Sequence, residues 1–468
     1  MFDPAYGDHG PDMAPRVAIV GAGPAGIRAA EALVDAGLRP ILIDEAPRPG
    51  GQIYRQPPPA LQRPARELYG FEATKAARLH QTFARIRPAM DYRSETLVWG
   101  VRDNRVLLSG SEGRAELYFD RIIVATGAMD RIAPIPGWTQ PGVYSLGGAQ
   151  VMLKYQASLI GRRPIFVGTG PLLYLIAWQY LKAGVRPAAV IETGTFSGLA
   201  SALPRLAARP QTLLKGVYFS AGLRARNIPI IYSANPADIY VEGESLVLSY
   251  SSYGKQAKVI GDAVALGSGL KPETQLAEVL GVAFAFHHPT RLHLPQCDIM
   301  GRSNLPHVYI AGDAGGIRGA DAAEAGGALA AMAVLKDLGW TINEARRSLL
   351  VKHMQRAERF RSGLESAFPY PTRCVTDLPD DAILCRCENI TVGAVRTAIP
   401  SWQVKDVNRL KAITRCGMGR CQGRLCGSAT AELLAAEAGQ RIVDIGRMRG
   451  QIPLKPLLGQ RFAEEVTS

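Results

Sequence analysis

The cysteines are the residues whose types and spacing most directly indicate chemistry. The chain of 468 residues has seven, and six of them fall in its C-terminal quarter. Cys385 and Cys387 have one position between them, and Cys421 and Cys426 follow with four positions between them, downstream of Cys416. Four thiolates in two pairs can hold a [2Fe-2S] cluster or a zinc ion. This clustering indicates a metal centre rather than a disulfide framework.

Short helices are expected to position these thiols. A charged helical stretch and a linker rich in Pro and Asp, residues 346–381, precede the first cysteine pair, so a small domain is expected over residues 382–468. The sequence predicts helices at 391–399, 406–413 and 428–438, which would project two cysteine loops toward one point.

A glycine turn near the N-terminus indicates a second kind of chemistry. A β-branched strand at residues 17–20 runs into a G-x-G-x-x-G turn, and a helix is expected at 27–36. Such a turn brings a pyrophosphate to the positive N-terminus of the helix. Glu45 lies 19 residues beyond the last glycine, where an acid accepts hydrogen bonds from the adenosine ribose. The turn is Gly21-Ala22-Gly23-Pro24-Ala25-Gly26.

Two later segments favour FAD over NAD at this first site, and a third belongs to the same resemblance. One follows the second strand, one ends the strand at 122–125, and one ends the apolar strand at 308–311. They resemble segments of glutathione- and thioredoxin-reductase-like flavoproteins over residues 16–340, and the resemblance implies that they line the cofactor. The residues are Gly50, Gly51 and Gln52, then Thr126 and Gly127, then Gly312 and Asp313. For Asp313 alone, a helix-cap or turn role is the alternative.

A second strand–turn–helix unit is expected at residues 133–263, inserted in a first domain that comprises 14–132 and 264–345. Its turn, Gly168-Thr169-Gly170-Pro171-Leu172-Leu173, has leucine where the third glycine belongs, and a strand ending at Glu192 follows. Leu173 would hold the helix away from the turn. Whether this domain binds NAD(P)H or is retained for its fold stays open. The predicted fold class is therefore α/β, with two Rossmann-like domains and a small helical domain.

Several functions are excluded by what the sequence lacks. Disulfide reductases need a cysteine pair beside the flavin, but residues 1–296 contain no cysteine. The formal charge of +13 is scattered without basic runs, which argues against nucleic-acid binding. His287, His288 and His293 lie among prolines and are expected to be turn residues. No signal-peptide pattern or long apolar run is found, so we expect a cytoplasmic chain without a membrane span.

The cysteine segments resemble the bacterioferritin-associated-ferredoxin-like domain. The matching residues are C-R-C-E, from Cys385, and T-R-C-G-M-G-R-C-Q-G-R-L-C-G, from Thr414. Fused to such a body, they resemble the α subunits of flavin-dependent amino-acid dehydrogenases, as in opine oxidases, D-hydroxyproline dehydrogenases and hydrogen cyanide synthases. Many relatives have alanine at Cys416, so we expect Cys385, Cys387, Cys421 and Cys426 as the ligands. Cys416 is then a buried, unligated thiol.

This resemblance implies a division of labour. A separate β subunit, similar to D-amino-acid oxidases and with its own FAD, oxidises an amine, and the α subunit relays electrons through FAD and the [2Fe-2S] cluster to an acceptor. No catalytic residue is expected in this chain. An opine or hydroxyproline is the expected substrate, and further candidates are an FMN at a subunit interface and a small third iron–sulfur subunit. The alternatives are a self-contained NAD(P)H-dependent reductase and a non-catalytic scaffold that holds NAD or ATP.

Overall fold

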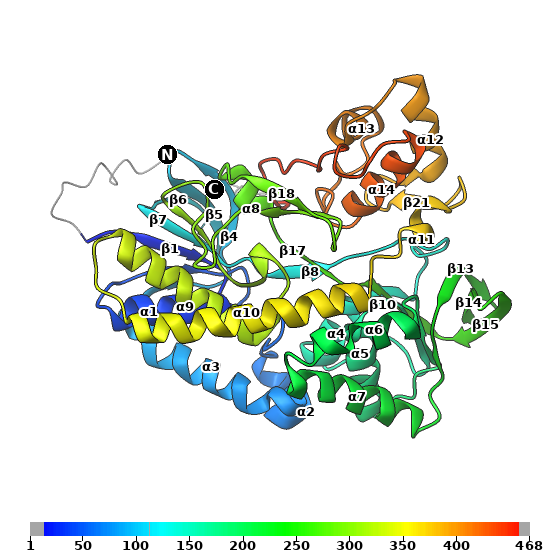
Figure 1. Ribbon diagram of the computed structural model, residues 1–468, viewed down its shortest axis with the longest axis horizontal. Coiled ribbons are helices and arrows are strands. Elements are labelled where there is room, and N and C mark those ends of the chain that lie inside the picture. The colour runs from blue at the N-terminus through cyan, green and yellow to red at the C-terminus, as the bar shows by residue number, and fades with distance from the viewer. Residues whose placement is uncertain (1–13, 112, 458–468) are drawn as a thin grey trace, which may run out of the picture.

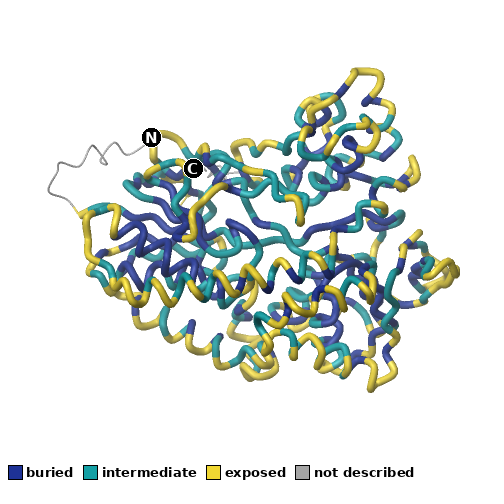
Figure 2. The backbone as a smooth tube through the Cα atoms, in the orientation of Figure 1, coloured by how far each residue is buried: buried dark blue, intermediate teal, exposed yellow. Residues whose placement is uncertain are grey.

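Residues 14–111 and 113–457 are described by the structure, a computed structural model. It has two parallel sheets, each with its helices, and a small helical unit at the C-terminus (Figure 1). Buried residues concentrate in the two sheets and the helices against them, and the long helix α10 (Glu344–Ala367) runs along both parts with much of its surface exposed (Figure 2). Among the described residues, none of the helices combines the length and apolarity needed to cross a bilayer.

The first sheet consists of five parallel strands in the order β20-β7-β1-β2-β3. Four of its strands, β1, β2, β7 and β20, are short apolar runs that are buried on both faces, as parallel strands usually are, whereas the edge strand β3 is half-buried. One face packs on helices α1 (Pro24–Asp35) and α9 (Ala320–Asp337), and the other packs on the antiparallel sheet β4-β5-β6. The parallel strands are β1 (Val17–Val20), β2 (Ile41–Ile43), β3 (Asp91–Arg93), β7 (Arg121–Val124) and β20 (Val308–Ile310). The antiparallel strands are β4 (Leu97–Arg102), β5 (Arg105–Gly110) and β6 (Gly113–Tyr118).

The second sheet repeats this plan in the order β12-β11-β10-β16-β9. Helices α4 and α5 share a core with it, and the antiparallel sheet β13-β14-β15 packs on its other face. Its strands are β9 (Val143–Ser145), β10 (Pro164–Thr169), β11 (Ala189–Glu192), β12 (Ile230–Ile231) and β16 (Ala263–Ser268). The antiparallel sheet consists of β13 (Ala234–Glu242), β14 (Ser245–Ser252) and β15 (Lys255–Gly261). The helices of this domain are α4 (Leu146–Lys154), α5 (Pro171–Lys182), α6 (Phe196–Leu206) and α7 (Pro210–Arg224).

The predicted return to the first domain at residue 264 is wrong. Strand β16 pairs in parallel with β10 over its whole length, and its alanines at 263 and 265 are fully buried in the second core. The chain leaves the second sheet only after residue 268. It then forms β17 (Leu270–Pro272), which pairs antiparallel with β8 (Ala128–Asp130), so the two passages between the sheets run side by side.

The C-terminal unit has a core of its own around three helices. They are α12 (Val392–Ser401), α13 (Val407–Thr414) and α14 (Gly427–Glu437), close to the predicted ranges. Side chains of Thr391 and Asp406 cap the first two, because each oxygen accepts backbone N–H groups of the first turn. The hairpin β21 (Ile383–Cys385) and β22 (Ile390–Thr391) and the short helix α11 (Arg373–Thr376) complete it.

The remaining elements lie at the edges of the two sheets. They are η1 (Pro59–Leu61), α2 (Ala65–Tyr69), η2 (Gly70–Glu72), α3 (Ala73–Ile86), η3 (Arg87–Ala89), α8 (Gln275–Val279), β18 (Phe284–His287), β19 (Leu292–Pro295) and η4 (Gly312–Gly315).

Candidate dinucleotide site and cysteine centre

The first glycine turn can be built only from glycine at two of its positions. Gly21 has a φ of +110°, and a Cβ there would lie 2.3 Å from the carbonyl oxygen of Ala125. At Gly26 a Cβ would lie 1.8 Å from the oxygen of Gly21. The close approach of turn, strand and helix therefore requires hydrogen in place of a side chain.

The middle glycine has a different role. Gly23 has an extended backbone with φ −80°, and a Cβ there would meet nothing closer than the Cα of Gly51, at 3.6 Å. The protein could therefore accommodate a side chain at this position, so packing within the chain does not explain the glycine. Bare backbone here is what a bound ligand would require. Gly23 is also the N-cap of α1, where no side chain caps the free N–H groups and Pro24 begins the helix. This is a ready cradle for a pyrophosphate.

The segment after β2 closes over this cradle. The N–H of Gly50 donates to the oxygen of Ala22 at 2.8 Å, and a Cβ on Gly51 would lie 2.8 Å from the Cα of Gly23. Gly50 and Gly51 therefore line the turn as expected of the cofactor loop. Gln52 is exposed, and its side-chain oxygen accepts a hydrogen bond from Arg55 at 2.8 Å.

Two neighbouring acids follow β2, and the structure separates their roles. The carboxylate of Asp44 accepts the backbone N–H groups of Ala22 at 2.5 Å and Ala46 at 2.7 Å, and burial raises its pKa. Glu45, the acid chosen from the spacing, has a side chain that is 53% exposed and pairs with Lys455. The spacing did not indicate this role of Asp44 within the turn. Glu45 as the ribose acceptor stays a prediction.

The other predicted cofactor residues gather at the carboxyl ends of the first sheet. Gly312 has a φ of +64°, and a Cβ there would lie 2.7 Å from that of Ala25 in α1. The carboxylate of Asp313 accepts the N–H groups of Arg318 at 2.8 Å and Gly319 at 3.2 Å, just before α9, and burial raises its pKa. These contacts give Asp313 the turn role considered above, at a position that also faces the start of α1.

Thr126 and Gly127 lie at the end of β7, where the chain leaves the first sheet. The hydroxyl of Thr126 donates to the oxygen of Glu273 at 2.7 Å, and the N–H of Glu273 donates to the oxygen of Gly127 at 2.9 Å. The outgoing and returning passages are thus joined beside the predicted cofactor loop.

The second glycine turn differs from the first at its third position. Leu173, in place of the third glycine, is fully buried in the core of that domain. Glu192 is also fully buried, and its carboxyl accepts the N–H groups of Gly170 at 3.1 Å and Gly194 at 2.8 Å. Burial raises its pKa to about 8. Glu192 is thus bonded to its own turn in the way that Asp44 is bonded to the first.

Five cysteines converge in the C-terminal unit. The sulfur atoms of Cys385, Cys416 and Cys426 all lie within 4.8 Å of one another, and all three residues are buried. Hydrogen bonds from Cys416 and Cys426 lower the pKa of Cys385. Cys387 and Cys421 are less buried and lie beside each other, and burial raises the pKa of Cys387.

The buried trio includes Cys416, which the resemblance had set aside. The sulfur of Cys416 lies 3.2 Å from the hydroxyl of Thr430, so it has a partner besides the other thiols. All four predicted ligands lie in the same centre, and which four of the five thiols bind metal stays a prediction. Soft thiolates at this density suit a [2Fe-2S] cluster or zinc, so the donor set fits the expected group.

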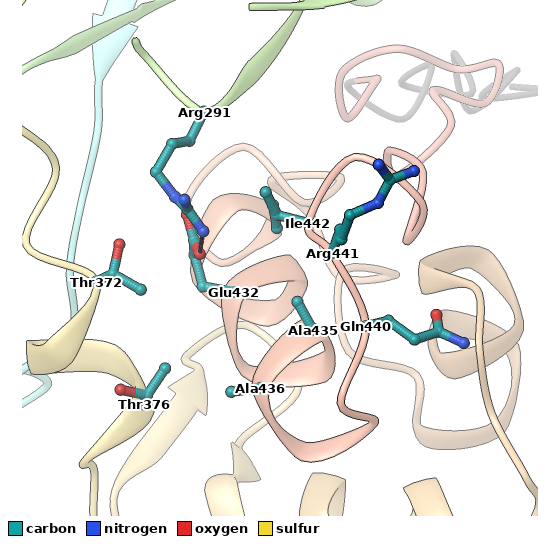
Figure 3. Close-up of a pocket in the computed structure, with 9 residues that line it drawn as sticks. All are labelled: Arg291, Thr372, Thr376, Glu432, Ala435, Ala436, Gln440, Arg441 and Ile442. Carbon is teal, nitrogen blue, oxygen red and sulfur yellow. Dashed lines mark hydrogen bonds and ion pairs between the residues drawn. The ribbon is translucent and has the colours of Figure 1, made fainter. Parts of the chain in front are cut away.

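Contacts join the cysteine unit to the rest of the chain. Arg291 of the β18–β19 hairpin pairs with Glu432 of α14, at the edge of a cavity of about 340 Å³ (Figure 3). That cavity holds none of the predicted cofactor residues. His287 and His293 belong to the same hairpin, and Nδ1 of His287 lies 2.8 Å from the hydroxyl of Thr290.

Two family models match the chain. Residues 15–327 match the family described as pyridine nucleotide-disulphide oxidoreductase, and residues 383–436 match the BFD-like [2Fe-2S] binding domain. These matches confirm the predicted fold class and the dinucleotide-binding and iron–sulfur domains.

Curated relatives match over nearly the whole chain. One subunit of the opine oxidase of Rhizobium meliloti is 34% identical over 467 residues, covering 96% of this chain and 86% of that protein. The hydrogen cyanide synthase subunit HcnB of Pseudomonas aeruginosa is 33% identical over 455 residues, covering 94% and 97%. The structure of L-proline dehydrogenase from P. horikoshii has the same fold, with a TM-score of 0.69 and 18% identity over 97% of this chain and 81% of that one.

The predicted resemblance is thereby confirmed for the body and the cysteine unit together. The chain belongs to the pyridine nucleotide-disulphide oxidoreductase family, and it is an oxidoreductase flavoprotein subunit with a fused BFD-like [2Fe-2S] domain.

Proposed function

We propose that this chain is the electron-relay subunit of a heteromeric amine-oxidising flavoenzyme. The observation that carries the proposal is that one chain contains both a glycine turn with bare backbone at Gly23 and a centre of five thiols, three of them buried. A bound flavin would accept electron pairs and a [2Fe-2S] cluster would pass single electrons onward. The residues around Gly23 and Gly51 hold the first group, and the cysteines hold the second.

The relatives supply the expected reaction and partner. They are named as subunits of opine oxidase and hydrogen cyanide synthase. For this chain we propose a partner flavoprotein subunit, similar to D-amino-acid oxidases, that removes electrons from the C–H bond of an amino acid. An opine or hydroxyproline is the proposed substrate, and an FMN at the subunit interface is a further candidate carrier.

The second turn gives less support to the self-contained NAD(P)H reductase. Leu173 stands in place of the third glycine and is fully buried behind the turn, where the close packing of helix and strand normally requires glycine. A disulfide reductase activity lacks its thiols, since no cysteine precedes residue 297.

The test compares the chain alone with the chain purified together with its partner. We expect the single chain to give little turnover with amino acids and a redox dye, and little with NADH and the dye, while the complex oxidises one amino acid of a substrate panel. Amino-acid turnover by the single chain would contradict the relay assignment. Rapid NADH oxidation would favour the reductase, and NAD or ATP as the only released nucleotide would favour the scaffold.

A further inference from the structure

The loop between the last two cysteines of the centre makes a buried ion pair with the first domain. Arg424 lies inside this loop, and its guanidinium donates to both carboxylate oxygens of Glu273, at 2.6 and 3.3 Å. Both side chains are only 12% exposed. A two-pronged contact between a guanidinium and a carboxylate fixes orientation as well as distance.

Glu273 is held in place by Thr126 and Gly127, two of the predicted cofactor residues. It follows β17 directly, and both of its main-chain groups are bound: its oxygen by the hydroxyl of Thr126, and its N–H by the oxygen of Gly127. The residue that holds the cysteine loop is therefore fixed by the two residues that leave the first sheet beside the dinucleotide. Any shift of one is transmitted to the other through three short contacts.

A second contact joins the same two segments, two positions away from the ion pair in each. The side-chain amide of Gln275 donates to the main-chain oxygen of Gln422 at 2.7 Å, so the cysteine loop is held at both a side chain and its backbone. Arg424 also donates to the oxygen of Leu454 at 2.6 Å, and the N–H of Leu454 donates to the oxygen of Trp99 in β4. The cysteine loop is thus bonded to the first domain through two segments, the one after β17 and the one around Leu454.

Charge favours the same arrangement. Lys271 of β17 lies two positions before Glu273, close enough to Cys421 and Cys426 for their charges to act on it, and burial lowers its pKa to about 8. Together with Arg424, it places cationic side chains beside a centre that carries negative charge when its thiolates bind iron. The carboxylate of Glu273 is neutralised by its pairing with Arg424.

We propose that Glu273 and Arg424 are positioning residues that hold the cysteine ligand loop against the dinucleotide site, so that electrons cross between the two groups within this chain. The proposal rests on the relay function. With both groups bound, the reduced flavin would be oxidised in two one-electron transfers, each reducing one Fe³⁺ of the cluster to Fe²⁺, and its protons would pass to solvent. A one-electron acceptor, here an added dye, would reoxidise the cluster after each transfer.

The test uses the full-length chain with both groups bound. Glu273→Gln keeps the shape and the main-chain contacts to Thr126 and Gly127 but removes the charge. Iron and sulfide contents and the electron paramagnetic resonance spectrum of the reduced cluster should stay at wild-type values. After flash photoreduction of the flavin, we expect electron arrival at the cluster to slow by about tenfold or more, because breaking one side of a buried ion pair costs over 1.4 kcal/mol.

Two controls separate this contact from domain docking in general. Arg291→Gln removes another pair between the same two parts, with Glu432, and Arg441→Gln removes an exposed pair with Asp444 inside the cysteine unit. In both variants, electrons should reach the cluster from the flavin at the wild-type rate. The charge exchange, Glu273→Arg combined with Arg424→Glu, should recover part of the loss.

The possible failures are distinguishable. A wild-type chain without iron or without flavin would overturn the proposed function itself. Wild-type transfer that persists unchanged in Glu273→Gln and in Arg424→Gln would overturn only the positioning role. Equal slowing in Arg291→Gln would also overturn it, since docking as a whole would then be responsible.

Discussion

The two glycine turns have the same topology but differ at the position of the third glycine. In the first, Gly26 is required, since a Cβ there would lie 1.8 Å from the oxygen of Gly21. In the second, Leu173 takes this place and is fully buried in the core of its domain. The acids after the two strands are held alike, since Asp44 and Glu192 each accept an N–H of their own turn. A repeated strand–turn–helix unit can thus keep its topology while one copy changes the packing between turn and helix.

The largest expected effect comes from a single methyl group in the first turn. Gly23→Ala fits the protein, since its Cβ would have 3.6 Å to the nearest atom, but it occupies the space for the pyrophosphate. We expect the purified variant to be folded and free of flavin, as measured by the absorbance of the supernatant after denaturation. Gly216→Ala, at an open helical position in α7, is the matched control and should keep the cofactor. A wild-type amount of flavin released from Gly23→Ala would contradict the assignment of the first turn.

A smaller effect should separate the two acids after β2. Asp44→Asn removes a charged acceptor at the edge of the turn, and we expect about a tenfold weaker cofactor affinity. Glu45→Gln removes an exposed pair with Lys455 and should change the affinity by less than about threefold. Titration of the apoprotein with FAD measures both. The reverse order would support Glu45, the acid expected from the spacing, as the ribose acceptor.

The next prediction concerns pH and the second turn. Burial raises the pKa of Glu192 from 4.5 to about 8, so the folded chain keeps a proton that the unfolded chain loses above pH 4.5. Its contribution to stability is therefore complete below pH 4.5 and falls as the pH rises to about 8, by about 1.4 kcal/mol per unit at most. Glu192→Gln should show a flatter dependence of the melting temperature between pH 5 and 8. Parallel curves for the two proteins would mean that Glu192 is ionised when folded.

Much of the fold could be predicted from local pattern, because strand, glycine turn and helix are encoded within a few adjacent residues. The helices α12 to α14 began within one residue of their predicted starts for the same reason. The place of β16 could not be predicted, since its partner β10 is about a hundred residues away.

The candidate site was harder to predict in two respects. Sequence spacing separated Cys416 from the ligand pairs, whereas the structure packs it with Cys385 and Cys426, which depends on how the loops fold over α14. The Glu273–Arg424 contact joins residues 151 positions apart, and nothing in the local pattern of either residue indicates the other.

The metal content of the anaerobically purified chain, read with the electron paramagnetic resonance spectrum of its reduced form, tests the central claim most directly. We predict about two irons and two sulfides per chain and the signal of a reduced [2Fe-2S] cluster. Ser substitutions at Cys385, Cys387, Cys421 or Cys426 should abolish or perturb that signal, and Cys416→Ser should keep the iron. Loss of iron in Cys416→Ser with retention in Cys426→Ser would contradict the ligand set, and zinc in place of iron in the wild-type chain would contradict the relay itself.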